Sequence, residues 1–179
     1  MKIYSKDNKK LYFNLIYKNG KITDTYKQDY LEGKTLLDNL KVKMTKEINN
    51  KTHDNYKIQF LSTLDNYNSQ VQEQIINEEN LLNLKFYYIE KEETIENFVA
   101  STITNKIINN ISNLQKNNIT PKYYKFTFIN KKDITSSIKI SNIKEDFITN
   151  QNNLFIISEM LKDNKDILKY TDIKYEYTK

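Results

Sequence analysis

A glycine, lysine and threonine triplet, Gly33-Lys34-Thr35, is the first segment whose residue types could do chemistry. Phosphate-binding loops end in such a triplet, because backbone amides and a lysine at a helix N-terminus hold phosphate groups. The pattern fails upstream, where Gln28 stands at the position of the first glycine. The strand before it also belongs to a predicted hairpin rather than to a buried parallel sheet, so we interpret Thr35 as a helix cap.

The same turn partly matches a nuclease pattern in which a carboxylate holds a metal and a lysine orients water. Glu32 and Lys34 form its second half, with Asp24 or Asp29 as the upstream acid. A short pattern of common residue types arises readily by chance, so we interpret this segment as a charged turn. The sequence therefore predicts no catalytic residue, no metal site and no cofactor.

Missing residue types exclude several classes of site. Cysteine is absent and His53 is the only histidine, which rules out a thiol nucleophile, a thiolate zinc site and a two-histidine metal site. A serine triad would have to use His53, and the chain has no serine framed by glycines. We interpret His53 as a solvated loop residue. The scarcity of potential catalytic residues favours a binding function over an enzymatic one.

The composition indicates the kind of genome and compartment. All 28 basic residues are lysine, and asparagine and isoleucine are heavily used, which is typical of an AT-rich genome such as that of a phage or mobile element. Hydrophobic residues make up 38% and aromatic residues 12%, which predicts a folded chain. The N-terminus lacks a signal-peptide core, and no apolar run approaches the ~18 residues of a membrane helix. We predict a cytoplasmic protein, in the host cytoplasm if phage-encoded, with no membrane partner.

Charge is unevenly distributed along the chain. Residues 1–60 carry a net charge of +6, residues 61–100 carry −6 and residues 101–179 carry +5. An acidic middle would repel phosphate, which weakens the case for a continuous nucleic-acid groove.

Hydrophobic periodicity predicts the elements that position these residues. Apolar residues alternate as in strands at 11–17, 21–26, 56–64, 84–90, 123–128, 134–141 and 173–177. Between the first two strands, Asn19-Gly20 supplies a type I′ hairpin turn. Apolar stripes of helical period predict helices at 35–50, 69–82, 94–114 and 150–162. We therefore predict an α+β fold, with a mainly antiparallel sheet and about four packed helices.

The predicted order of elements repeats along the chain. Hairpin, helix and strand occur at 11–64 and again at 122–178, which is consistent either with a tandem ββαβ pseudo-repeat or with two ordinary hairpins. We predict a single compact domain over residues 1–179, with possible halves at 1–64 and 122–179 joined by the acidic segment 65–121.

Lysines interleaved with aromatic residues are the strongest positive signal. They occur at Lys85–Tyr88, Lys122–Phe128 and Lys174–Tyr177. If one face of these strands is apolar core, the other face would display Tyr123, Lys125, Tyr87 and Lys174. Exposed tyrosines on a sheet can grip a protein, or can stack bases while lysines contact phosphates.

We hypothesise a non-enzymatic binding protein that acts through a protein partner, of the inhibitor, immunity or adaptor type, for example a phage or mobile-element inhibitor of a host defence protein. The acidic residues could imitate the charge of nucleic acid. The adjacent carboxylates Glu78-Glu79 and Glu92-Glu93 would point in different directions on a helix, so we interpret them as a solvated acidic face rather than as a catalytic pair. The predicted partner-binding residues are Glu73, Glu78, Glu79, Glu90, Glu92, Glu93, Tyr87 and Tyr123.

Three alternatives stay open. The first is a nucleic-acid-binding accessory protein that uses Lys122, Lys125, Lys131 and Lys132, whose affinity would fall steeply with salt. The second is a structural virion component, which predicts self-association. The third is a metal-dependent nuclease, the least unlikely enzyme.

Overall fold

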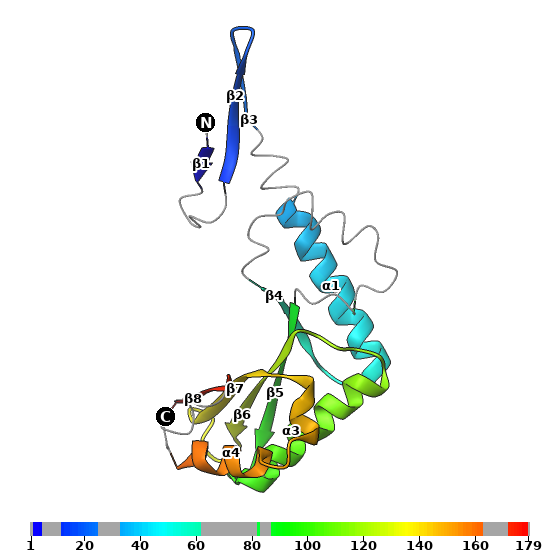
Figure 1. Cartoon of the computed structure of the whole chain (residues 1–179), viewed down its shortest axis with the longest axis vertical. Helices are drawn as coiled ribbons and strands as arrows, with labels where there is room; N and C mark the ends of the chain where they lie inside the picture. The colour runs from blue at the N-terminus through cyan, green and yellow to red at the C-terminus, as the bar shows by residue number, and fades with distance from the viewer. Residues whose placement is uncertain are drawn as a thin grey trace.

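The computed structural model of the chain shows an α+β protein, which confirms the predicted fold class (Figure 1). The residues that the structure describes are 2–4, 12–24, 33–61, 82, 87–162 and 172–178.

The N-terminal segment forms the predicted hairpin. Its strands β2 (Tyr12–Lys18) and β3 (Lys21–Asp24) pair antiparallel, and β1 (Lys2–Tyr4) pairs antiparallel with the other edge of β2. Asn19 and Gly20 form the turn with φ values of 53° and 76°. A Cβ at Gly20 would meet no atom within 4 Å, so the left-handed backbone is the reason that this position favours glycine.

A five-stranded mixed sheet forms the larger part of the structure, in the order β4-β5-β6-β7-β8. Its only parallel pair among the described strands is β5 with β6. The helix α3 (Ala100–Lys116) lies between these two strands in the chain, as a parallel connection requires. The strands are β4 (Lys57–Phe60), β5 (Tyr87–Ile95), β6 (Tyr123–Asn130), β7 (Ser137–Ile143) and β8 (Lys174–Thr178).

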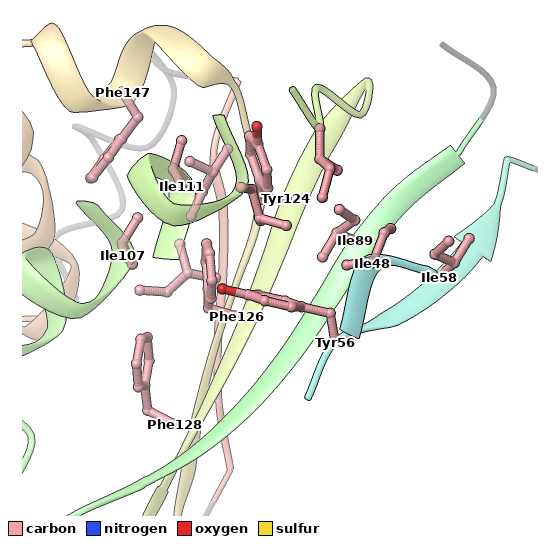
Figure 2. Close-up of a cluster of buried hydrophobic side chains, with 14 of the residues drawn as sticks. Ile48, Tyr56, Ile58, Ile89, Ile107, Ile111, Tyr124, Phe126, Phe128 and Phe147 are labelled. Carbon is pink, nitrogen blue, oxygen red and sulfur yellow. The ribbon is translucent and has the colours of Figure 1, made fainter. Parts of the chain in front are cut away.

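One face of this sheet is covered by helices. The buried side of α3 packs against it, with the 3₁₀ helix η4 (Glu145–Thr149) and α4 (Asn153–Leu161) beside α3. Figure 2 shows Tyr124, Phe126 and Phe128 along β6, beside Ile107 and Ile111 of α3. All five side chains are fully buried, and burial stabilises by about 1.5–3 kcal/mol for a large apolar side chain. The apolar alternation predicted for β6 is therefore confirmed.

The helix α1 (Gly33–Thr52) packs beside the edge strand β4. Leu40, Met44 and Ile48 are buried one turn apart, as the predicted stripe requires. The helix begins at Gly33, so Thr35 lies inside its first turn and the predicted cap at Thr35 is wrong. The preceding described strand, β3, is antiparallel to β2, which agrees with our rejection of a phosphate loop.

The prediction that a helix starts at Thr94 is also wrong. Strand β5 continues through Ile95, and α3 begins only at Ala100. Residues Glu92–Ile95 pair with Thr127–Asn130 of β6, and this pairing overrides the helix propensity of a run rich in lysine and glutamate.

The predicted number of helices is not confirmed. The described residues contain three α-helices and the 3₁₀ helix, and the helix predicted at 69–82 lies outside them except for its last residue, Leu82. In α4 the buried residues are Ile156, Ile157 and Met160, whereas Leu154 is 47% exposed.

The tandem repeat is not confirmed either. Both segments have the order ββαβ, but β8 pairs with its own hairpin strand β7, whereas β4 pairs with β5 and not with β3. The two segments therefore share an order of elements without sharing a pattern of strand pairing.

Three tyrosines belong to the core and differ in how their hydroxyls are satisfied. Tyr56, Tyr87 and Tyr124 are all fully buried. The Tyr56 hydroxyl donates to Asn110 Oδ1 at 2.9 Å, and the Tyr87 hydroxyl donates to the carbonyl of Leu82. The Tyr124 hydroxyl has no hydrogen-bond partner among the described residues.

Replacement of Tyr56 and of Tyr124 by phenylalanine should distinguish a hydrogen-bonded buried hydroxyl from one without a partner. Tyr56→Phe removes a buried hydrogen bond and should lower the free energy of unfolding by about 1 kcal/mol. Tyr124→Phe removes a hydroxyl that is buried without a partner, so it should leave this free energy unchanged or raise it. Urea denaturation of both variants measures the difference, and an equal loss in both would show that the Tyr124 hydroxyl is satisfied.

Candidate binding surface

Two tyrosines lie side by side on the face of the five-stranded sheet that α3 does not cover. Tyr88 of β5 and Tyr123 of β6 are register partners, and their rings stack with centroids 4.8 Å apart and planes 12° apart. Both side chains are partly buried, and desolvation by burial raises the pKa of each phenol. Such a pair contributes about 0.5–1.5 kcal/mol beyond its buried area, so stacking stabilises the two rings as one aromatic platform.

A row of polar contacts runs beside this platform. Glu90 and Lys125 are the next outward register partners, and they form an ion pair. The Lys125 Nζ lies 5.9 Å from the centroid of the Tyr88 ring. Gln59 donates to Glu90 at 3.2 Å and accepts from Lys41 of α1 at 2.7 Å. Burial alone would raise the pKa of Glu90, but hydrogen bonds from Lys125 and Gln59 and the lysine charges lower it.

The far half of the face carries a second ion pair. Lys139 of β7 and Glu176 of β8 are register partners, and their charged groups lie 2.8 Å apart. The hydrogen bond from Lys139 lowers the pKa of Glu176. Between the two ion pairs lies an open hollow of about 450 Å³, which Tyr88 and Tyr123 also line. We call this combination of stacked tyrosines and paired charges the tyrosine face.

The predicted site residues on β5 and β6 divide between the two faces of the sheet. Tyr123, Lys125 and Glu90 lie together on the tyrosine face. Tyr87 is fully buried, so the prediction that it is exposed is wrong, and Tyr88 takes its place. Successive strand residues point to opposite faces, and a shift of one residue reverses every assignment. The buried Ile89 has the same parity as Tyr87, and this signal could have placed Tyr87 inside.

The predicted acidic surface is only partly present among the described residues. Glu92 is exposed, but Glu93 points to the helix side and its side chain is only 14% exposed, so its interpretation as part of a solvated acidic face is wrong. Glu73, Glu78 and Glu79 lie outside the described residues.

The four predicted nucleic-acid-binding lysines do not form one surface. Lys122 and Lys125 lie near the start of β6, whereas Lys131 and Lys132 lie in the turn after its far end. Lys131 also pairs with Glu96 at 2.7 Å.

A second polar cluster, missed by the sequence analysis, lies on the helix side of β5. Lys91 is only 10% exposed, pairs with Asp54 and donates to Asn110 Oδ1 at 2.7 Å. Its Nζ also lies 4.8 Å from the centroid of the Tyr56 ring. Glu93 accepts from Asn110 at 2.6 Å and pairs with Lys106. Buried charges need partners of this kind, so the cluster ties β5 to α3 and to the loop before β4.

The described residues that could serve catalysis do not converge on a metal site. No group of three His, Cys, Asp or Glu side chains in the described ranges could hold a metal ion. His53 is exposed and follows the last residue of α1 with a φ of 52°. Of the nuclease pattern, Asp24 ends β3 and Lys34 lies in the first turn of α1, while Asp29 and Glu32 lie outside the described residues.

The chain was compared with protein-family models, with curated proteins and with solved structures. No protein-family model matches it, and searches of curated proteins and of solved structures return no match. No helix in the described part of the chain is long and apolar enough to cross a membrane.

The Lys91 cluster should make stability depend on pH in the acidic range. Burial alone would raise the pKa of Glu93, but hydrogen bonds from Lys106 and Asn110 and the nearby lysine charges hold it below its ordinary value of 4.5. The folded state therefore gains stability from the ionised carboxylate above pH 4.5, and loses it as the pH falls through the lower folded pKa. Burial alone would also raise the pKa of Asp54, but hydrogen bonds from Lys91 and Asn55 lower it, so the ionised Asp54 stabilises the folded state in the same way.

Glu93→Gln isolates this contribution, because glutamine keeps the size of the side chain but does not titrate. We expect the variant to be less stable than the wild type at neutral pH, and the two unfolding free energies to converge as the pH falls below 4.5. Urea denaturation across this range measures both curves. Parallel curves would contradict an ionised, hydrogen-bonded Glu93.

Proposed function

We propose that this chain is a non-enzymatic binding protein that acts through a protein partner, which it grips with the tyrosine face. The observation that carries this proposal is the stacked pair Tyr88 and Tyr123, flanked by ion pairs in strand register. Tyrosine is enriched in protein interfaces and among the residues that dominate their energy, because it offers large contact area with little loss of side-chain entropy.

The pairing of the lysines favours a protein over a nucleic acid. Lys125, Lys131 and Lys139 each lie against a glutamate, so each is already largely neutralised. A phosphate backbone draws its affinity from lysines whose charge is available. Each ring of the tyrosine pair also gives one of its faces to the other ring, which leaves less surface for stacking bases.

A surface of both charge signs suits another protein. Such a face can match a partner whose own charges alternate, and complementary charges set the orientation of the complex more than its affinity. The inhibitor, immunity or adaptor class fits these properties, since such proteins act by occupying a surface and need no catalytic groups. A phage or mobile-element inhibitor that acts in the host cytoplasm would be one example.

One observation favours the alternative of a nucleic-acid accessory. Lys122 and Lys174 form no ion pair with any residue that the structure describes, so their charges are available. This alternative requires an affinity for nucleic acid that falls steeply with added salt, and a flat response would remove it.

Truncation of the two tyrosines tests the proposal. The wild-type chain is used to capture a partner from the source cell, and the affinity of the purified partner is then measured for Tyr88→Ala and Tyr123→Ala. Each substitution should weaken binding by about tenfold or more, as loss of a central tyrosine does at interfaces. The control is Tyr17→Ala, because Tyr17 lies on β2 and is 74% exposed, and its loss should leave the affinity unchanged.

Two results would sink the proposal. One is the absence of any protein that the wild type captures specifically. The other is a captured partner whose affinity is the same for wild type, Tyr88→Ala and Tyr123→Ala. Urea denaturation of the variants accompanies the measurement, since a variant that has lost its fold is not informative about the interface.

A further inference from the structure

A hollow opens where several strands of the five-stranded sheet end together. Strands β6 and β8 begin there and β7 finishes there, because β7 is antiparallel to both. The hollow has a volume of about 780 Å³, and its walls include Lys122, Tyr123, Lys144 and Lys174. It shares Tyr123 and Lys174 with the hollow on the tyrosine face, so the two hollows adjoin, and we call the two together the depression.

A bulge in β7 shapes this hollow. The pairing of β6 with β7 shifts its register between Tyr124 and Phe126, and Asn142 opposite the shift has a φ of 60°. The Asn142 side chain donates to the backbone carbonyl of Asp172 at 3.2 Å, which links the end of β7 to the start of β8. Bulges redirect strand ends and recur beside functional sites. The hollow is therefore built into the pairing of the sheet.

The depression carries an excess of positive charge. Five lysines and two carboxylates line its two parts among the described residues, a net charge of +3, and Glu90 beside Lys125 reduces this to +2. Lys144 is paired with Asp172 at 2.8 Å, and Lys139 is paired with Glu176. The remaining excess resides on Lys122 and Lys174, which have no ion-pair partner in the described part of the chain and lie at the same strand ends as Tyr123.

We infer that this depression receives an acidic segment of the protein partner. The segment's carboxylates lie against Lys122 and Lys174, and a planar or apolar side chain lies against Tyr123. The charge is complementary to a few carboxylates, because only two lysines are uncompensated, whereas a continuous phosphate backbone draws its affinity from a larger number of lysines whose charge is available. This inference rests on the proposed function and adds the chemistry of the segment that is bound.

The test uses a short capped peptide of alternating glutamate and tyrosine, labelled with a fluorophore, and a single-stranded oligothymidylate of equal charge. Fluorescence anisotropy measures the binding of each probe at low and at physiological salt. We expect the wild type to bind the peptide more tightly than the oligothymidylate. The double variant Lys122→Glu/Lys174→Glu should weaken peptide binding by about tenfold or more. Lys122→Gln/Lys174→Gln, which removes the charges without reversing them, should give a smaller loss.

The matched control is Lys131→Glu/Lys132→Glu, which changes the net charge by the same amount at the far end of β6. It should leave peptide binding within about twofold of the wild type, because that turn lies outside the depression. Equal losses in both double variants would overturn the inference, since they would indicate attraction by net charge alone.

Two further outcomes separate this inference from the proposed function. If the peptide does not bind, but Tyr88→Ala still weakens the captured protein partner, the acidic-segment inference is overturned and the proposed function stands. If the oligothymidylate binds more tightly than the peptide and depends on Lys122 and Lys174, both are overturned in favour of nucleic-acid binding.

Discussion

The parallel pairing of β5 with β6 decides where the side chains of the tyrosine face lie. It places Tyr88 beside Tyr123 and Glu90 beside Lys125 on the outer face. Because strand residues alternate, the same pairing turns Tyr87 into the core. The pairing extends along β5 from Tyr88 to Ile95 and needs α3 as its connection, so helix, core and outer face all depend on it.

The pairing of β5 with β6 also places charged side chains on the inner face, where Lys91 and Glu93 point toward α3. Charged groups in such a place are unfavourable unless their hydrogen bonds are satisfied, and Asp54, Lys106 and Asn110 satisfy them here. The cluster resembles a catalytic site in its residue types, but its groups are used in bonds to one another. It explains how β5, a strand of the sheet, can carry charged residues on the face that α3 covers.

On the outer face, lysines and glutamates of neighbouring strands neutralise one another across the sheet. Lys125 meets Glu90 and Lys139 meets Glu176. The formal net charge of +5 therefore overstates the positive charge that a partner would meet on most of this surface. Only the depression at the strand ends departs from this balance, because Lys122 and Lys174 form no ion pair with any of the described residues. A surface that is balanced in most places and positive in one can orient a protein partner.

The sequence by itself determined the features that depend on neighbouring residues. The Asn19-Gly20 turn, the buried alternation of β6 and the apolar stripe of α1 follow from backbone conformation and from period, and the structure confirms all three. Only the tertiary structure decided the length of β5, its parallel partner and the face that each of its residues occupies. Its Lys-Glu-Glu segment is equally suited to a helix, and the strand that overrides this preference lies beyond α3 in the chain. The tyrosine pair and the ion pairs join residues that are distant in sequence, so no local pattern could predict them.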